Sequence, residues 1–298
     1  QIRERAGIFD LVRRLGGKKF DTAVLLPNGF RWALVARMAN IPRRIGYDRD
    51  GRGGLLTDRL LARRRDGQFV PVSTRDYYLG IARYLGAQDP DPTMQLVTRP
   101  EHDDRCRQLL AQAGFRLGQP LVLINPGASY GEAKMWYPDR FAQVADRCVR
   151  ELGACTAISG APNESLIIAQ VMAAAKLPIL NLPALGFDLT LLKSAMKQSH
   201  LLITNDTGPR HIAAAFDVPV VTVFGPTDPA WSEIGFQMER QVMAHVYCRP
   251  CQKKRCPLQG TPDFHQCMTE ISSDTVFERA AGLLRSEERL TLVIDPAC

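Results

Sequence analysis

The second part of the chain alternates between short apolar runs and stretches in which apolar side chains recur at helical spacing. Runs that predict buried strands lie at 120–127, 154–160, 178–184, 200–206 and 218–226. Predicted helices lie at 138–153, 164–176, 188–199, 209–217 and 272–289. Continuous apolar strands that alternate with helices are typical of a parallel sheet covered on both faces. The sequence therefore predicts an α/β protein.

The first part shows a weaker form of the same pattern. An amphipathic helix is predicted at 2–15, a buried strand at 21–27 and a helix at 30–40, with few other convincing strands before Pro100. The 298 residues suit two domains. We expect an N-terminal domain at 1–100, a linker helix within 101–119 and a second domain at 120–298. Since the chain opens on Gln and its first domain has few strands, we expect that domain to be truncated; a naturally short domain is the alternative.

Three polar loops follow predicted strands: 125–136, 205–211 and 225–229. The carboxyl ends of parallel strands meet at one edge of the sheet, where ligands of such sheets bind. The first loop carries Ser129, Gly131 and Lys134, a hydroxyl, a flexible backbone position and an ammonium that suit a diphosphate. It contains neither a Walker A nor a GxGxxG motif. An exposed lysine without a ligand is the alternative for Lys134.

The second loop, "NDTGPRH", combines a carboxylate with a helix start. Gly208 permits a close backbone approach, and Thr207 is predicted to cap a helix whose free amides favour phosphate. Asp206 either binds sugar hydroxyls or serves as a structural cap. His211 follows within the first turn; a structural core histidine is its alternative reading.

Positive charge is concentrated in one segment. The formal net charge is +7, and residues 43–75 contain nine Arg against four Asp. This segment suits phosphates, an anionic membrane or nucleic acid, or is a solvated surface. Only Tyr47 and Phe69 interleave it with aromatic rings, which disfavours nucleic-acid binding. No apolar stretch approaches the ~18 residues of a membrane span, so a soluble cytosolic protein without a signal peptide is expected.

Four of the eight cysteines cluster as Cys248, Cys251, Cys256 and Cys267, with His265 nearby. Cys106, Cys148, Cys155 and Cys298 are scattered and are read as ordinary small residues. The C-x2-C spacing suits zinc, but the rest of the cluster is irregular. A structural metal, disulfides and free thiols all remain open, with disulfides disfavoured in a cytosolic protein.

Two segments, "NPGASYGEAKMWYPDRFAQVAD" and "TNDTGPRHIAAAFDVPVVTVFGPTDP", occur in an order that resembles glycosyltransferase family 9, the lipopolysaccharide core heptosyltransferases. Residues 25–58 resemble the N-terminal domain of the type II enzymes in this family. The resemblance covers nearly the whole chain. It implies a GT-B architecture, in which two Rossmann-like domains face each other across a cleft.

The resemblance also implies a site and a reaction. Ser129, Tyr130 and Lys134 would hold the diphosphate of ADP-heptose, and Asp206 would bind hydroxyls of the heptose. Thr207 and Gly208 would bring amides to phosphate, and His211 would support this loop. The implied reaction is inverting transfer to the inner core of lipopolysaccharide, with no obligatory metal or other cofactor. Cys-rich segments occur in some members of the family, and a structural zinc at Cys248–Cys267 stays open.

The family places its catalytic Asp in the first strand-to-helix loop of the N-terminal domain, a part not recognised here. No base is therefore assigned, since Asp10 and Asp21 fall in the wrong elements. The anionic acceptor would meet basic residues, for which Arg31, Arg43 and Arg44, then Arg49 and Arg52, are candidates. The protein would act in the cytoplasm, peripheral to the anionic inner membrane. A related enzyme for another nucleotide sugar and an inactive nucleotide-sugar-binding fragment are the alternatives.

Overall fold

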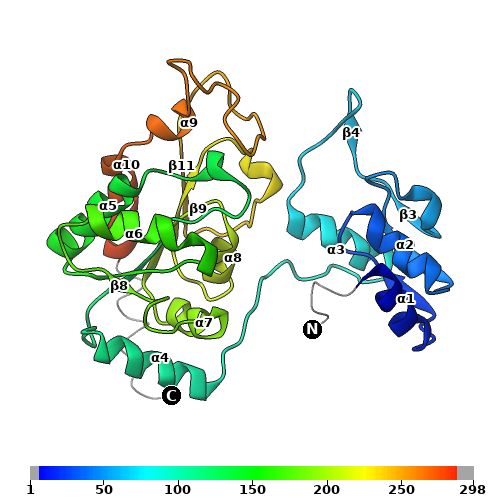
Figure 1. Cartoon of the computed structure of the whole chain (residues 1–298), viewed down its shortest axis with the longest axis horizontal. Coiled ribbons are helices and arrows are strands. Elements are labelled where there is room, and N and C mark those ends of the chain that lie inside the picture. Colours follow the sequence, from blue (N-terminus) through cyan, green and yellow to red (C-terminus); the bar gives the residue numbers. More distant parts are fainter. Residues whose placement is uncertain (1–6, 287–298) are drawn as a thin grey trace. The chain divides into compact units, whose positions relative to one another are not determined.

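The computed structural model describes residues 7–286, and they form two compact units that divide between Pro92 and Thr93 (Figure 1). Each unit is described by itself. Cys298, the predicted helix residues 2–6 and the end of the predicted helix 272–289 lie outside the described residues. In the described part no helix is both long and apolar enough to cross a bilayer.

Unit 1, residues 1–92, contains a small parallel sheet of order β1-β2-β3 and an antiparallel pair, β4 and β5. Its strands are β1 Thr22–Val24, β2 Arg43–Tyr47, β3 Asp58–Leu60, β4 Arg64–Arg65 and β5 Gln68–Phe69. Its helices are α1 Ile8–Gly16, α2 Phe30–Met38, α3 Thr74–Tyr84 and the short 3-10 helix η1 Gly53–Leu55.

The prediction for unit 1 was right that α1, β1 and α2 exist, and it missed the partner strands β2 and β3. It was wrong that the strand at 21–27 is buried, since no residue of β1 is buried and Val24 is exposed. In β2 only Ile45 and Gly46 are buried, since Arg43 is exposed at the start of the strand. A strand with so few buried apolar side chains lacks the period-2 signal on which a sequence-based prediction depends.

Unit 2, residues 93–298, is built on a six-stranded, wholly parallel sheet of order β11-β10-β9-β6-β7-β8. The strands are β6 Leu121–Asn125, β7 Cys155–Ile158, β8 Leu180–Asn181, β9 Leu201–Asn205, β10 Val220–Phe224 and β11 Glu239–Met243. The longer helices are α4 Pro100–Gln112, α5 Pro138–Leu152, α6 Ser165–Ala174, α7 Leu189–Lys197, α8 Gly208–Ala214 and α10 Ser273–Arg285. Short helical turns are η2 Glu132–Lys134, η3 Pro162–Glu164, η4 Pro229–Trp231 and α9 Gln266–Thr269.

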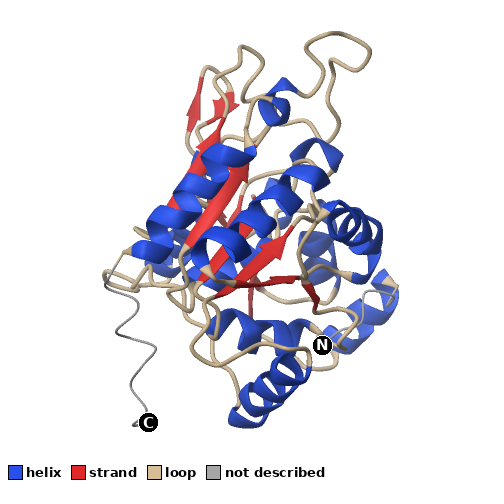
Figure 2. Cartoon of the chain, turned by 90° about the vertical axis from the view of Figure 1, so that its left-hand side faces the viewer, coloured by secondary structure: helices blue, strands red, loops and turns tan. Residues whose placement is uncertain are grey.

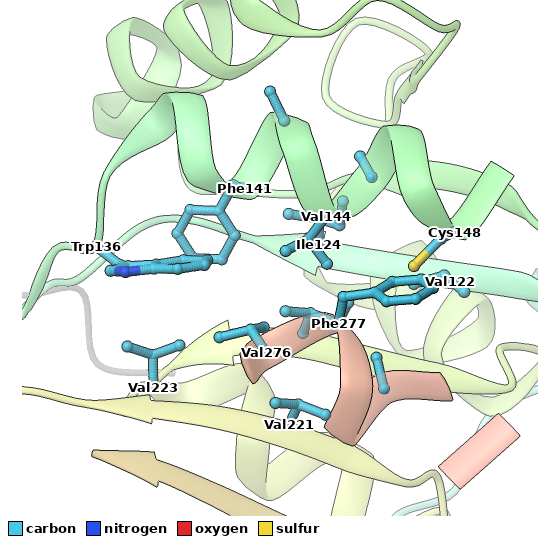
Figure 3. Packing of buried hydrophobic residues seen from close by; sticks show 14 of the residues in the cluster. Val122, Ile124, Trp136, Phe141, Val144, Cys148, Val221, Val223, Val276 and Phe277 are labelled. Carbon is cyan, nitrogen blue, oxygen red and sulfur yellow. The ribbon is translucent and has the colours of Figure 1, made fainter. Parts of the chain in front are cut away.

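Helices cover both faces of this sheet, as predicted (Figure 2). Successive side chains of β6 point to opposite faces: Leu121 and Leu123 join a core with α4, α7 and α8, while Val122 and Ile124 join a core with α5 and α10. Figure 3 shows the second core, where Trp136 packs edge-on against Phe141 with ring centroids 4.9 Å apart. Burying each such large apolar side chain contributes about 1.5–3 kcal/mol.

Helix ends follow the sequence signals. Pro138 begins α5, and Gly153 ends it in the left-handed conformation at φ 62°, which glycine adopts without a Cβ clash. Asp188 caps α7 by accepting a hydrogen bond from the amide of Leu191. Ser272 caps α10 through the amide of Thr275. These caps fix where each helix starts, and therefore the length of the loops at the sheet edge.

Candidate active site

The order of the sheet creates a switch point between β6 and β9. From β6 the chain continues outward to β7 and β8, and it then returns to the other side of β6 and continues through β9 to β10 and β11. The loops after β6 and β9 therefore leave the same sheet edge in opposite directions, the place where open parallel sheets bind ligands. We call residues 126–137 the β6 loop and residues 206–208 the β9 loop.

Asn205, at the end of β9, ties these two loops together. Its side-chain amide donates to the carbonyls of Pro126 at 2.8 Å and Gly127 at 3.3 Å, and its oxygen accepts from the amide of Trp136 at 3.2 Å. The Trp136 ring is buried and donates through Nε1 to the carbonyl of Ile271. With both ends of the β6 loop anchored in this way, η2 and its Lys134 have a defined position.

Lys134 and Asp206, predicted on separate loops, form a buried ion pair. The Lys134 ammonium donates to Asp206 Oδ2 at 2.5 Å and to the Asp206 carbonyl at 3.3 Å. Only 9% of Lys134 and 8% of Asp206 is exposed. The structure therefore excludes the reading of Lys134 as a solvated surface lysine.

Three further side chains hold the Asp206 carboxylate. Thr227 donates to Oδ2 and Ser232 donates to Oδ1, each at 3.1 Å, and Arg210 Nη1 lies 3.5 Å from Oδ1. Burial alone would raise the pKa of Asp206, but Lys134, Arg210 and Ser232 favour the carboxylate and bring its pKa below the ordinary value. Asp206 is thus a charged, fully oriented group at the switch point.

Arg210 lies behind Asp206 and is completely buried. Its guanidinium binds both carboxylate oxygens of Glu239 on β11, with Nη2 to Oε2 at 2.7 Å, and donates to the carbonyl of Ser232. Thr222 donates to Glu239 Oε1 at 2.5 Å. Burial opposes the charge on Glu239, but these hydrogen bonds lower its pKa. This pair has no local signal in the sequence, because 29 residues separate its members.

Tyr130 is half exposed and bridges the β6 loop to the chain beyond β11. Its ring lies under the Lys134 ammonium, 4.8 Å from Nζ to the centroid, and its hydroxyl donates to the carbonyl of Gln252 at 2.8 Å. Contact of an ammonium with an aromatic face is favourable. Tyr130 therefore belongs to the same constellation as Lys134.

A pocket of about 740 Å³ opens beside these loops, wholly within unit 2. A pocket of this volume suits a nucleotide-sized ligand. Its lining is mainly apolar, with polar groups from the strand ends. It includes Asn125, Ser129, Ser159, Gly160, Glu164, Leu182, Phe187, Asp188, Leu192, Thr207 and Gly208. Ser129, Thr207 and Gly208 were predicted site residues; Glu164 and Asp188 were not.

Glu164 lines the pocket and was not predicted, although its position in a loop after a strand marks it in the sequence. Its carboxylate accepts from the amide of Ala161 at 2.8 Å and lies directly over Gly127, where any Cβ would collide with it. The motif "GAPNE" after β7 places this acid in a loop at the same sheet edge as the other two. A systematic reading of every loop after a strand would have found it.

Two predictions for the β9 loop need correction or remain open. Thr207 stands at the N-cap of α8, but its side chain makes no capping hydrogen bond. Its hydroxyl instead lies 3.5 Å from Asn125 Oδ1 and 3.4 Å from Thr204 Oγ1. His211 is half buried, and burial followed by the charge of Arg210 lowers its pKa, so the neutral imidazole is favoured.

The four clustered cysteines surround one small cavity of about 20 Å³ together with His265. All are free thiols, and burial raises the pKa of Cys267 to about 11. Within residues 7–286, no three His, Cys, Asp or Glu side chains are arranged to hold a metal ion. The thiols have the right chemistry for zinc, but their arrangement does not fit a metal centre.

The predicted acceptor arginines of unit 1 have partners inside that unit. Arg52 is buried and donates to carbonyls of Tyr47, Leu25 and Pro27. Arg44 donates to backbone carbonyls, including that of Leu55 at 2.7 Å. The remaining candidates make more exposed contacts: Arg43 pairs with Asp58 at 2.9 Å, Arg49 stacks on Phe69, and Arg31 lies over Trp32.

Comparisons with known proteins agree with this geometry. The model of glycosyltransferase family 9 (heptosyltransferase) matches residues 8–261. Lipopolysaccharide heptosyltransferase 2 of Salmonella typhimurium is 30% identical over 294 residues, which is 92% of this chain and 80% of that protein. Its Escherichia coli K12 counterpart is 29% identical over 287 residues, or 91% and 77% of the two chains.

Solved structures support the same assignment. Escherichia coli ADP-heptose lps heptosyltransferase II superposes with a TM-score of 0.71 at 26% identity, covering 93% of this chain and 80% of that one. A family 9 protein of Veillonella parvula has the same fold, with a TM-score of 0.74 at 24% identity over 93% and 78%. These comparisons confirm the predicted α/β class of the GT-B heptosyltransferases. The chain belongs to glycosyltransferase family 9, the heptosyltransferase family, and is a glycosyltransferase.

Proposed function

We propose that this chain transfers a heptosyl group, with inversion, from ADP-heptose to the inner core of lipopolysaccharide. The names of its relatives support heptose transfer and a lipopolysaccharide acceptor. The observation that carries the proposal is a buried ammonium, Lys134, at a switch point beside a pocket of about 740 Å³. A nucleoside diphosphate needs both features, a concave site for its base and ribose and a cation for its phosphates.

The diphosphate would lie against the β6 loop. Lys134 would bind it, while the Ser129 hydroxyl and the Tyr130 ring flank the same position. Lys134 already has Asp206 as its counter-ion before any ligand binds. The incoming phosphates would share or take over this ammonium, and Arg210 would continue to balance Asp206.

The nucleoside would occupy the pocket between the loops after β6 and β7. Leu182, Phe187 and Leu192 give an apolar surface for a base, and Glu164 offers a carboxylate that can accept hydrogen bonds from ribose hydroxyls. Thr207 and Gly208 close the same pocket from the β9 loop, beside the heptosyl end of the donor.

In the proposed reaction an acceptor hydroxyl attacks the anomeric carbon of ADP-heptose, and the bond from this carbon to the diphosphate oxygen breaks. A base takes the hydroxyl proton, and preorganised cations stabilise the negative charge that develops on the departing ADP. Lys134 is the cation in position to do so. No residue is assigned as the base.

Asp206 is proposed to bind hydroxyls of the transferred heptose. Its oxygens already accept from Lys134, Thr227 and Ser232. A sugar hydroxyl would therefore replace Thr227 or Ser232 as a donor, an exchange of one hydrogen bond for another with small net cost. His211 would support this loop from α8.

The acceptor and its membrane surface are anionic, and unit 1 carries the basic segment 43–75. We propose that Arg31, Arg43 and Arg44 contribute to contact with the acceptor's phosphates, and that the enzyme acts peripherally at the cytoplasmic face of the inner membrane. Arg43 is the best placed of the three within its unit because its guanidinium is exposed while paired with Asp58.

No cofactor is proposed for the reaction, because the chemistry described above requires none. Zinc at Cys248, Cys251, Cys256 and Cys267 is supported only by the C-x2-C spacing in the sequence, and the arrangement of these thiols in the described residues does not favour it. Metal analysis of the gently purified protein, combined with thiol titration, tests it: four titratable thiols and no zinc would exclude this site.

Calorimetric titration of the chain with ADP, ADP-heptose and UDP-GlcNAc in parallel tests the proposal. We expect ADP-heptose to bind most tightly, followed by ADP, with UDP-GlcNAc far weaker. Tight binding of UDP-GlcNAc instead would indicate another nucleotide-sugar enzyme. Donor binding without transfer to a lipopolysaccharide inner-core acceptor would identify a nucleotide-sugar-binding protein, and no binding by a chain with a cooperative melt would refute the proposed function.

A further inference from the structure

The cysteine-rich segment, residues 248–267, packs directly against the β6 loop. The carbonyl of Gln252 accepts from the Tyr130 hydroxyl at 2.8 Å, and the carbonyl of Lys254 accepts from the amide of Ala133 at 3.1 Å. Arg255 Nε lies 3.5 Å from Glu132 Oε1. Three successive contacts thus join residues 252–255 to the loop that carries Lys134.

Gly131 allows this close approach. A Cβ built on Gly131 would lie 2.5 Å from the carbonyl oxygen and 2.9 Å from the Cβ of Lys254. No side chain fits in so little space without displacement of the backbone. The sequence at 131 therefore serves to bring the backbone of Lys254 against the β6 loop.

The contact brings a second ammonium to the Tyr130 ring. Lys134 Nζ lies 4.8 Å and Lys254 Nζ 5.7 Å from the centroid of the same Tyr130 ring. Among the ion pairs of residues 7–286, Lys134 has Asp206 and Arg255 has Glu132, whereas Lys254 has no carboxylate partner. An ammonium without a carboxylate partner, at a ring that a second ammonium also contacts, is a position where an anion is favoured.

We propose that Lys254 is a second cation for the diphosphate of the nucleotide donor, and that residues 252–255 form one wall of the diphosphate site. This inference rests on the proposed function. Lys254 is exposed, so its side chain is free to turn from the Tyr130 ring to a bound phosphate. The tyrosine ring holds the ammonium near that place before the ligand arrives, which reduces the entropy lost on binding.

The adjacent Lys253 provides a matched control. It is also exposed and carries the same charge, but within the described residues only Lys134 and Lys254 place an ammonium against the Tyr130 ring. Lys253→Gln and Lys254→Gln therefore remove the same net charge from the same segment, and only the second removes an ammonium held beside Tyr130.

The test measures ADP and adenosine affinities of the wild type, Lys253→Gln, Lys254→Gln and Lys254→Arg by calorimetry without acceptor or lipid. We expect Lys254→Gln to weaken ADP about three- to tenfold, to leave adenosine unchanged and to reduce the salt dependence of ADP binding. Lys253→Gln should match the wild type, and Lys254→Arg should retain most of the affinity.

Each outcome supports or overturns the proposed role of Lys254. If the wild type does not bind ADP, the proposed function fails first. If the wild type binds ADP and Lys254→Gln binds it equally well, Lys254 does not contact the diphosphate and the proposal is overturned. Equal losses for both glutamine variants would show general electrostatic attraction instead. Melting temperatures of all four proteins exclude unfolding as the cause.

Discussion

Lys134 is the residue on which the proposed donor site depends most. We expect Lys134→Ala to weaken ADP binding by about tenfold or more, because a charge-assisted hydrogen bond to phosphate contributes about 1.5–3 kcal/mol. Calorimetry with ADP and with adenosine measures this, and adenosine affinity should change little. Lys176, exposed on unit 2, gives the control Lys176→Ala. Unchanged ADP affinity in Lys134→Ala would remove Lys134 from the diphosphate site.

A substitution at Asp206 tests whether its carboxylate binds the heptose or only positions Lys134. If the carboxylate binds heptose hydroxyls, Asp206→Asn should weaken ADP-heptose by about tenfold while ADP loses much less. The two ligands differ only in the sugar, so the ratio of their affinities is the measurement. Because Asp206 also orients Lys134 at 2.5 Å, some loss for ADP is expected. Equal losses for both ligands would make Asp206 a positioning residue for Lys134.

At the scale of elements, α8 and β11 are joined by the Arg210–Glu239 pair. We expect Arg210→Met to lower the free energy of unfolding by about 3–5 kcal/mol, because it leaves Glu239 buried without its counter-ion. Replacing both residues, as Arg210→Met with Glu239→Leu, should recover most of this loss. Urea denaturation of the two proteins and the wild type gives the comparison.

The exposed pair of Asp104 and Arg107 on α4 supplies a control, since Arg107→Met should cost less than about 1 kcal/mol.

The pH dependence of stability gives a second test of the Arg210–Glu239 pair. Folding lowers the pKa of Glu239, so its contribution to stability is present above its unfolded pKa of about 4.3 and disappears as pH falls toward the folded value. The double variant should therefore lose less stability than the wild type on acidification. An equal loss would contradict the stabilising role of the Glu239 carboxylate.

The same pair shows why some elements were predictable and others were not. β6, β9 and β10 are buried at every position, so they read as continuous apolar runs in the sequence. β11 is an edge strand, "ERQVM", whose first residue is the buried Glu239. Its charge is compensated by Arg210 on a distant helix, which no local pattern reveals. β2 was missed for a similar reason, since its polar start hides Ile45.

The residues of the candidate site that lie on loops directly after predicted strands could be predicted from the sequence, whereas their partners could not. Strand-to-helix order places the loops after β6 and β9 at one edge, so Ser129, Lys134 and Asp206 could be grouped from sequence, and the family resemblance added Tyr130. Their partners Thr227, Ser232 and Gln252 come from segments whose positions depend on tertiary packing. Thr207 was expected to cap α8 by residue type, but its hydroxyl turns toward Asn125, a competition that local propensity does not capture.

At the scale of the whole molecule, both large hydrophobic cores and the pocket lie in unit 2. We expect residues 93–298 alone to fold cooperatively and to bind ADP with an affinity within about twofold of the whole chain. Circular dichroism melting and calorimetry test this, with Lys134→Ala in the shorter chain as the control for specific binding. A folded unit 2 that fails to bind ADP would show that unit 1 contributes to nucleotide binding.

The contact between Gly131 and Lys254 also limits how this enzyme can change by mutation. Crowding between two side chains can be relieved when a second mutation makes one of them smaller. At Gly131 the nearest atom is a backbone carbonyl, which every amino acid carries. No substitution at position 254 can therefore compensate for a larger residue at 131. A suppressor would have to move the backbone, for example by changing the length of the segment around residues 252–256, so the two loops are constrained to evolve together in shape while their side chains vary.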